Sequence, residues 1–506
     1  MSGIGDPAAM LLVWALLAPL VALAAGLVRP RFAAWGAMAA AAVALLLAFL
    51  ALGGESRELR LSWAPSGGIE ARLRFDGLAA LYSLLATGIG LAVLVYASAY
   101  MPLHLHHEHR PERDGIRFWV LMTGFMAAMI WLAAAQDLLL LFVAWDVTAV
   151  ASYFLIGFDS EKTAARRAAL MALFVTGVSA IGILIGAAML WSRYGTVEIG
   201  ALSGQVEPGG WTTVAVALIA VGALAKSAQV PLHFWLPRAM AAPTPVSSYL
   251  HSAAMVAAGV YLLARVYPLL AAAPEVREAL VAIGFLSMAV GGVLALGADE
   301  FKRLLAYSTI AQYGYVVVML GLGGTYGVAG AALYVLAHAL GKCGLFLTAG
   351  AATEATGEKA LSKVGGLGAS HPALAAASGV CAATLAALPL TIGFFKDEVF
   401  FEAAHHGGAA LTALAVVGAA STVAYIARFW TGIFLGAPKQ PGRAIPARLV
   451  WPVAALALAA LAGGVAVGPF AALASAAGEA SVAGLKPLDL AYRLEATPAN
   501  LMALAA

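Results

Sequence analysis

The segment ALAKSAQVPLHFWLPRA, residues 223–239, ends an apolar run with one lysine and two prolines. The preceding residues, TVAVALIAVG at 213–222, carry no charge, and Lys226 lies five residues before Pro231. Proline interrupts a helix because it lacks an amide hydrogen and its ring collides with the preceding turn. The segment therefore predicts a membrane helix that is broken beside a buried ammonium group.

The composition of the chain is that of an integral membrane protein. Of its 506 residues, 62% are hydrophobic and 11% are charged, whereas a soluble domain has about 25% charged residues. Lipid cannot satisfy backbone N–H and C=O groups, so spanning segments are helices or closed barrels. The apolar runs are too long and uniform for barrel strands, which alternate over about ten residues. We therefore predict an all-α polytopic membrane protein, and the net charge of +3 gives no indication of nucleic-acid binding.

About fourteen apolar runs approach the length that spans a bilayer, roughly 20 residues. They lie at 8–28, 32–53, 77–100, 117–135, 138–158, 168–192, 211–236, 245–270, 276–298, 303–323, 325–351, 371–400, 408–436 and 449–472. The loops after the odd-numbered runs hold sixteen Lys and Arg residues, and the opposite loops hold seven. Because basic loops stay on the cytoplasmic side, we expect a multi-pass protein of a prokaryotic inner membrane with both termini outside.

The runs group into four regions. Residues 1–116 hold three helices and, at 55–76, alternating residues around APSGG that predict a small external β-hairpin. Residues 117–270 and 271–436 hold five helices each, and since five is odd, the second set enters the membrane from the opposite side. Residues 437–506 hold the last helix and an Ala-rich tail, which we expect to form an amphipathic helix on the membrane.

Two interrupted helices belong to these five-helix regions. Helix 7 contains Pro231, and helix 12 contains Pro389 seven residues before Lys396. Paired interrupted helices in inverted repeats indicate an ion site near the middle of the bilayer.

Ionisable side chains within the runs are the candidates for that site. Each central charge costs about 2.5–3.5 kcal/mol on insertion scales, so charged side chains there should face one another and water. The predicted proton pathway consists of Asp146, Lys226, His251, His338, Lys342 and Lys396, and its auxiliary polar residues are Ser247, Ser248, Ser308, Gln312, Tyr334, Asp397 and Glu398.

Asp146, in LLLLFVAWDVTAVASYFLIGF at 138–158, is the expected counter-ion of Lys226. A change at the carboxylate changes the proton affinity of the lysine, so the pair predicts a switchable proton site. A static salt bridge between helices is the alternative, although buried ion pairs stabilise a fold poorly.

His338 and Lys342 are four residues apart and therefore lie on one helical face. Histidine titrates near neutral pH and relays protons through either ring nitrogen. The alternative for His251 and His338 is a hydrogen bond to a backbone carbonyl, and for Lys396 it is a side chain that extends to the membrane surface.

The loop LHLHHEHRPERD, residues 103–114, contains His104, His106, His107 and His109. Clustered histidines can bind metal, but solvated loop histidines are the favoured interpretation, and we expect no metal site. The sequence contains no Cys cluster, phosphate-binding loop or dinucleotide-binding turn. We therefore expect no cofactor and no catalytic chemistry of its own.

Five motifs resemble, in the same order, the antiporter-like proton-translocating subunits of respiratory complex I and of Mrp-type sodium/proton antiporters. They are SYFLIGF (152–158), AKSAQVPLHFWLPRAMAAPTPVSSYLHSAAMVAAGVYL (225–262), LLAYSTIAQYGY (304–315), LAHALGKCGLFL (336–347) and GFFKDE (393–398). The resemblance covers roughly residues 76–436. It implies fourteen core helices, two inverted five-helix repeats, broken helices 7 and 12, and a hydrophilic axis across the membrane plane.

The family's functional positions fall on residues already selected. The resemblance assigns the helix 7 lysine, the helix 8 histidine, the helix 11 pair and the helix 12 lysine to Lys226, His251, His338 with Lys342, and Lys396. Asp146 stands where the family has glutamate, which keeps the charge and shortens the side chain by one methylene.

The resemblance implies a subunit that translocates protons or another cation and is coupled to one or more protein subunits of a membrane complex. Protons or Na⁺ and the lipid bilayer are the other expected partners, with no nucleic acid. The family includes the membrane subunit of DAB-type inorganic-carbon uptake complexes. The chain ends near its fourteenth span, which favours a two- or few-component system over complex I. The alternatives are a Na⁺/H⁺ antiporter subunit of an Mrp-type complex, a non-conducting membrane anchor for a soluble partner, and a self-sufficient transporter of a small solute.

Overall fold

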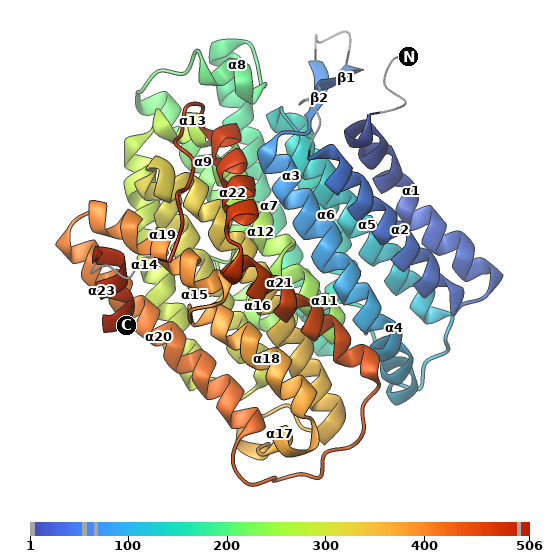
Figure 1. The fold of residues 1–506 in the computed structure, drawn as a ribbon. Helices are drawn as coiled ribbons and strands as arrows, with labels where there is room; N and C mark the ends of the chain where they lie inside the picture. Colours follow the sequence, from blue (N-terminus) through green and yellow to red (C-terminus); the bar gives the residue numbers. More distant parts are fainter. Residues whose placement is uncertain (1–5, 53–57, 65–68, 493–496) are drawn as a thin grey trace.

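The computed structural model of the protein describes residues 6–52, 58–64, 69–492 and 497–506. These residues form a bundle of long helices with one small β-hairpin at the end of the bundle where the N-terminus lies (Figure 1). The elements are α1 (Pro7–Val28), α2 (Phe32–Ala51), β1 (Glu58–Ala64), β2 (Ile69–Arg74), α3 (Gly77–Leu84), the π-helix η2 (Leu85–Ile89), α4 (Gly90–His107), α5 (Asp114–Ala134), α6 (Leu138–Ile156), α7 (Thr163–Tyr194), α8 (Ile199–Ser203), α9 (Gly210–Lys226), α10 (Trp235–Arg238), the 3₁₀ turn η3 (Ala239–Ala241), α11 (Thr244–Ser252), α12 (Met255–Arg265), α13 (Tyr267–Ala271), α14 (Pro274–Gly297), α15 (Phe301–Leu322), α16 (Gly324–Thr356), the 3₁₀ turn η4 (Leu361–Lys363), α17 (Leu367–Ser370), α18 (Pro372–Leu385), α19 (Ile392–His406), α20 (Ala409–Phe434), the 3₁₀ turn η5 (Ala447–Leu449), α21 (Trp451–Val465), α22 (Gly468–Ser481) and α23 (Pro498–Ala505).

The helices are long and apolar enough to cross a membrane. The described residues contain twelve helical stretches of at least 18 residues with this character, and two shorter apolar helices, α9 and α18. The two shorter helices begin where runs 7 and 12 were expected. The predicted fold class, an all-α polytopic membrane protein, is confirmed.

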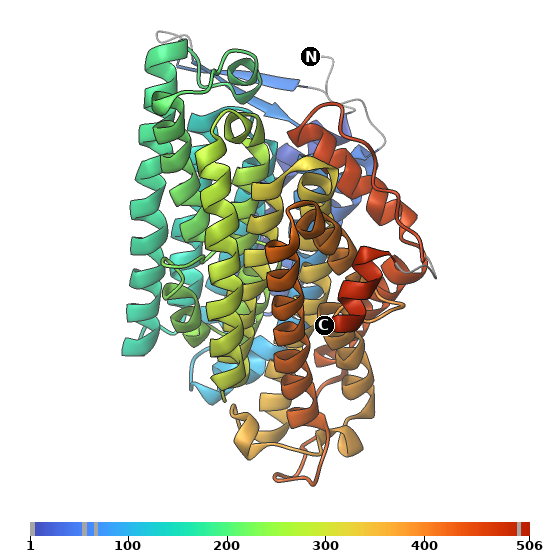
Figure 2. The ribbon, with the colours of Figure 1, turned by 90° about the vertical axis from the view of Figure 1, so that its left-hand side faces the viewer.

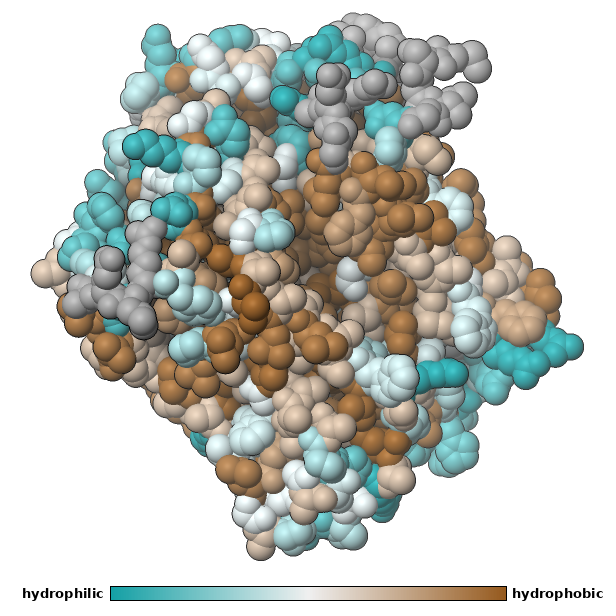
Figure 3. All heavy atoms as spheres, in the orientation of Figure 1, coloured by the Kyte–Doolittle hydropathy of each residue, from teal (hydrophilic) through white to brown (hydrophobic). Residues whose placement is uncertain are grey.

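The helices are arranged around a buried centre. Each spanning helix has a most apolar window of 18 residues. All residues of this window are buried in α16 and in the α11–α12 pair, whereas only 28% of them are buried in α20 and 33% in α1. Large apolar side chains are exposed on the outer helices, for example Leu27, Phe174 and Val293. Figure 3 shows apolar side chains over the middle of the face that carries α1 and α2 and hydrophilic ones towards the ends. This distribution suits a protein that is surrounded by lipid.

Three central helices are interrupted. Residues 227–234 separate α9 from α10, and residues 386–391 separate α18 from α19, with Pro231 and Pro389 inside these segments. A third interruption at residues 253–254 separates α11 from α12 and contains no proline. Each interruption leaves backbone N–H and C=O groups that no longer bond along a helix, so polar groups become available within the bundle.

The hairpin is present in the expected segment. Strands β1 and β2 are antiparallel, with Glu58 opposite Arg74 and Arg60 opposite Arg72. Arg72 fixes the hairpin to the helices: its guanidinium lies 2.5 Å from the Glu198 carboxylate, and its backbone N–H donates to Asp137. The predicted turn, APSGG, falls mostly outside the described residues.

Two expectations about the ends of spans are wrong. The segment at 103–114 is not wholly a loop, because α4 continues through His107 and carries three of the four histidines on its last turns. The tail expected at 473–506 is not one helix, because α22 ends at Ser481 and α23 forms separately at Pro498–Ala505. Figure 2 shows α22 and α23 on the opposite side of the bundle from α7. In α22 a row of small residues, including Ala474 and Gly478, packs against the bundle and is buried.

Candidate functional site

Lys226 is the last residue of α9 and is fully buried. Its ammonium donates to the Trp145 carbonyl oxygen at 2.9 Å and to the Thr148 hydroxyl. The same nitrogen lies 4.1 Å from the centre of the Trp145 ring, in a cation–π contact. The C-terminal end of a helix carries partial negative charge, so the break after α9 places the lysine where a cation is favoured.

Asp146 lies in α6 and is half-buried, but it forms no direct ion pair with Lys226 in the described chain. Successive residues of a helix point about 100° apart. Lys226 packs against the side of α6 that presents Trp145 and Thr148, and Asp146 points around the helix from that side. The carboxylate still interacts electrostatically with the lysine at longer range. The expected direct contact is therefore replaced by one carbonyl, one hydroxyl and one indole ring.

The break after α9 depends on a close approach of α12. A methyl group added at Gly259 would lie 2.1 Å from the Ser227 hydroxyl and 2.2 Å from the Ala223 carbonyl oxygen. Ser227 also donates to the Val256 carbonyl at 2.9 Å, which ties the two helices together. Only glycine fits between them without moving one helix.

Gly259→Ala should therefore lower the free energy of unfolding by about 1–3 kcal/mol, the usual cost of overpacking a core. The matched control is Gly177→Ala in α7, where an added methyl meets no atom within 4 Å. That change should be neutral or stabilising by up to about 1 kcal/mol, because alanine favours helix. Unfolding in mixed detergent micelles measures both. Equal stability of the two variants would show that α12 moves away from Ser227 at no cost.

His251 lies at the end of α11, immediately before the third interruption. Its ring is fully buried between Trp235 and Phe346, with ring centres 6.1 and 6.3 Å away. Neither ring nitrogen has a hydrogen-bond partner among the described protein atoms, and neither does the Ser247 hydroxyl one turn earlier. Ser248 is also buried, and it donates to the Thr244 carbonyl at 2.8 Å.

One face of α16 carries Tyr334, His338 and Lys342, each four residues from the next. All three side chains are buried. The Lys342 ammonium donates to the Ser308 hydroxyl of α15. The His338 ring packs edge-on against Tyr313 at 5.0 Å and lies beside the backbone of Ser252, but neither ring nitrogen reaches hydrogen-bond geometry with a described protein atom. Phe346, four residues further along, reaches His251, so this face joins the two histidines.

Lys396 lies in the second turn of α19 and is fully buried. Its ammonium is 2.5 Å from the carboxylate of Asp397 and 4.7 Å from the centre of the Tyr334 ring. The adjacent carboxylate is thus a direct partner of a pathway lysine rather than only an auxiliary polar group. Glu398 is half-buried in the same turn. Lys396 does not extend to an exposed surface.

A hydrogen-bonded group of hydroxyls surrounds the amide of Gln312. The Tyr334 hydroxyl donates to its oxygen at 2.9 Å, and its nitrogen donates to Thr422 and Tyr425 of α20 at 3.1 Å each. Tyr315 extends the group through a 3.0 Å contact with Thr422. Sequence reasoning included Gln312 and Tyr334 but not the α20 residues or Tyr315, and it also missed Trp145 and Thr148. Thr422 and Tyr425 could have been selected from the sequence, because they are polar residues within the apolar run at 408–436.

Comparisons with known proteins agree with this architecture. A sequence profile described as NADH:quinone oxidoreductase/Mrp antiporter, TM, matches residues 135–422, and one described as NADH-Ubiquinone oxidoreductase (complex I), chain 5 N-terminus, matches residues 63–113. NADH-quinone oxidoreductase subunit L of Mycobacterium tuberculosis (strain ATCC 25618 / H37Rv) is 35% identical over 453 residues, which is 85% of this chain and 70% of that protein.

Of two further relatives, one is named as an antiporter component and the other is a chain of a solved Mrp complex. A Rhizobium meliloti (strain 1021) protein, named as a probable component of a K(+)/H(+) antiporter, is 37% identical over 390 residues, which is 75% of this chain and 38% of the relative. A chain of the solved Mrp complex from Dietzia sp. DQ12-45-1b matches with a TM-score of 0.87 and 32% identity, over 99% of this chain and 54% of that one. This chain therefore spans about half the length of that Mrp chain and less of the Rhizobium protein.

The interrupted helices and the buried lysines and histidines define a polytopic membrane subunit of the antiporter-like class. The chain belongs to the NADH:quinone oxidoreductase/Mrp antiporter family of membrane subunits.

Proposed function

We propose that this chain translocates protons through the bundle, by way of Asp146, Lys226, His251, His338, Lys342 and Lys396. The supporting observation is that buried polar groups on this route lack partners within the described protein: the Ser247 hydroxyl and both ring nitrogens of His251 and His338. Buried polar groups in native proteins are hydrogen-bonded to protein or to ordered water. Water at these atoms would join the histidines to the lysines as a proton-conducting chain.

Three buried lysines carry most of the potential charge on this route, and only Lys396 has a carboxylate in direct contact. Like charges repel strongly in a medium of low dielectric constant. Protonation of Lys342 therefore disfavours simultaneous protonation of Lys396, and such groups titrate as a coupled set. In this proposal a charge that arrives at one station drives the proton from the next, and Asp146 modulates Lys226 from its half-buried position.

We propose that the whole chain works as one subunit of a membrane complex. The relatives are named as subunits or come from a complex, which supports one or more partner subunits that supply or use the energy. The surplus of basic loop residues supports an inner-membrane location with both termini outside. We also retain inverted repeats over 117–270 and 271–436, supported by an interrupted helix in each.

An antiporter role with Na⁺ or K⁺ as the exchanged ion is the second candidate. The name of the Rhizobium relative, a probable K(+)/H(+) antiporter component, and the description of the matching family profile as Mrp antiporter favour it. A non-conducting anchor is disfavoured because it gives no reason to bury Lys226, Lys342 and Lys396 at zero exposure. A cavity of ≈720 Å³ lies where α4 ends and α7 begins, and its lining includes His104, Asp159 and Lys302. Lys226, Lys342 and Lys396 do not line it, so it gives no support to a solute carrier built around these lysines.

The test is proton flux in proteoliposomes that contain the chain with its co-purifying subunits. Lys342→Met should reduce flux at least about tenfold, since a positioned proton-transfer group usually contributes 10²–10⁴ in rate. Lys486→Met changes an exposed lysine of the tail and should leave flux unchanged. Repeating the assay with choline in place of both Na⁺ and K⁺ separates proton conduction from cation exchange. Normal flux in Lys342→Met, or none in a correctly folded wild-type complex, would favour the anchor.

A further inference from the structure

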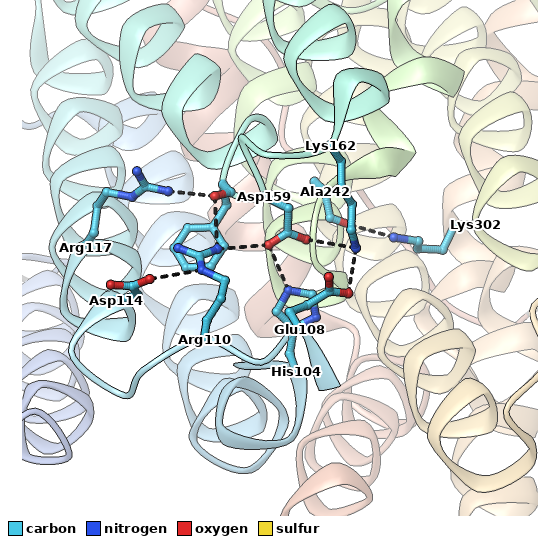
Figure 4. A network of polar contacts seen from close by, with 10 residues as sticks. His104, Glu108, Arg110, Asp114, Arg117, Asp159, Lys162, Ala242 and Lys302 are labelled. Atoms are coloured by element: carbon cyan, nitrogen blue, oxygen red, sulfur yellow. Dashed lines mark hydrogen bonds and ion pairs between the residues drawn. The ribbon is translucent and has the colours of Figure 1, made fainter. Parts of the chain in front are cut away.

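Three side chains that are able to bind a metal ion converge at the end of the bundle where α4 ends and α7 begins. His104 and Glu108 lie four residues apart at the end of α4, on one face. Asp159 reaches them from the connection between α6 and α7. One potential ligand atom from each residue lies within 4.8 Å of the others. Figure 4 shows Asp159 between His104, Arg110 and Lys162, with Glu108 against Lys162.

The separations suit a metal ion. With bonds of about 2.0–2.1 Å in a tetrahedral site, two ligand atoms lie about 3.3 Å apart. The Nε2 atom of His104 is 3.1 Å from Oδ1 of Asp159, so these two already have that separation. The Glu108 side chain is 30% exposed, and its ligand oxygen already lies within 4.8 Å of the other two ligand atoms. A change of its side-chain rotamer would complete a three-ligand set.

The ring of His104 is held in place for this role. It stacks on Tyr100 with ring centres 5.7 Å apart, and only 12% of the side chain is exposed. Asp159 is 6% exposed and is fixed by the Arg110 guanidinium at 3.2 Å. Two of the three ligands are therefore preorganised, which reduces the entropy lost on binding. By contrast, His106 and His109 are exposed and do not belong to this group of three ligands.

An exposed lysine, Lys162, bridges the two carboxylates. The Lys162 ammonium is 2.6 Å from Glu108 and 3.9 Å from Asp159, and its side chain is 51% exposed. A lysine so exposed can move into water, and a divalent ion would replace its charge. All four side chains line the ≈720 Å³ cavity, together with His107, so an ion and its water ligands have access.

Although the sequence of the histidine-rich segment alone favoured no metal site, we propose that His104 and Glu108 of this segment, with Asp159, form a binding site for a first-row divalent transition-metal ion. Zn²⁺ is the expected ion. The imidazole nitrogen favours such ions over Mg²⁺ and Ca²⁺, which prefer oxygen ligands only. The site does not depend on proton translocation by the buried lysines. The same cavity is lined by Lys302, whose ammonium donates to the Ala242 carbonyl at 2.7 Å.

The experiment is calorimetric titration of the purified full-length chain in detergent with ZnCl₂, together with visible absorption of bound Co²⁺. Wild type should bind one ion per chain. His104→Ala and Glu108→Gln should each weaken binding at least about tenfold. Lys162→Ala should tighten binding severalfold, because it removes the cation that competes for Glu108. A residue with a purely structural role would not produce a gain in affinity.

The controls separate this site from the other histidines. His106→Ala alters the same turn but an exposed side chain, and His405→Ala alters an exposed histidine of α19; both should bind as wild type. Thermal unfolding without metal confirms that each variant is folded. If His104→Ala does not fold, the binding measured for Glu108→Gln decides the outcome. No stoichiometric binding by wild type, or binding that both ligand variants leave unchanged, would overturn the proposal.

Discussion

Replacing Lys226 with methionine should reduce proton flux by a factor of at least about 100, within the range expected for loss of a positioned proton-transfer group. Methionine keeps the length and packing of the side chain but has no ammonium. Its partners are the Trp145 carbonyl and the Thr148 hydroxyl, which have alternative donors in water or along α6. The fold should therefore survive while the pathway loses a station. The measurement is flux in proteoliposomes at matched protein incorporation.

Two further variants define what the lysine needs. Thr148→Val removes the neutral hydroxyl that contacts Lys226 and should cost less than about tenfold, since one hydrogen bond is worth about 0.5–1.5 kcal/mol. Asp146→Asn removes the charge that acts at longer range and should alter both the rate and its dependence on pH. If Lys226→Met conducts as wild type, the route through α9 is excluded, whatever the effect of Lys342→Met.

The fold was accessible from the sequence because lipid imposes a simple pattern. Runs of about 20 apolar residues mark helices, and Pro231 and Pro389 mark two interruptions. The interruption at 253–254 had no such signal, because tertiary hydrogen bonds replace those of the helix. Tyr313 donates to the Ser252 carbonyl at 3.3 Å, and Ser227 donates to that of Val256. These donors come from other helices, so no local pattern contains them.

The sequence allowed the site residues to be selected, but it did not predict which of them contact one another. A charge in a membrane run is conspicuous by itself, which is why Lys226, Lys342 and Lys396 could be selected. Their contacts depend on the rotation of each helix about its axis, which the packing of neighbours determines. That rotation turns Asp146 aside from Lys226. It also joins Gln312 to Thr422, a contact between residues 110 positions apart. Neither result follows from sequence spacing.

A buried ion pair holds the end of α12 to the start of α3. The Arg265 guanidinium contacts the Asp76 carboxylate at 2.5 and 3.0 Å, and the two side chains are 3% and 9% exposed. Asp76 also caps α3 by accepting the Ala79 amide at 2.9 Å. Arg265 is held as well by the Tyr261 hydroxyl at 3.0 Å. Because α12 packs against the break after Lys226, this pair fixes one end of a site helix.

Asp76→Ala should therefore lower the free energy of unfolding by about 3–5 kcal/mol, since it leaves the Arg265 charge buried and unpaired. Asp76→Asn retains much of the cap and isolates the loss of the ion pair. Glu358→Ala is the control: it removes a solvent-exposed pair with Lys363 at 3.4 Å, worth about 0–1 kcal/mol. Unfolding in mixed micelles measures all three. A loss from Asp76→Ala no larger than that from Glu358→Ala would show that water reaches Arg265.

The effect should also depend on pH with a defined sign. Burial raises the pKa of Asp76, but the Arg265 guanidinium, its hydrogen bonds and the Ala79 amide together hold that pKa below its usual value. A carboxyl with a depressed pKa stabilises the fold above its unfolded pKa of about 4, and this contribution is lost as the pH falls through the folded pKa. The stability difference between wild type and Asp76→Asn should thus be full at neutral pH and shrink only in acid below about pH 4. A difference that stays constant through this acid range would show that the carboxylate of Asp76 contributes through packing rather than through its charge.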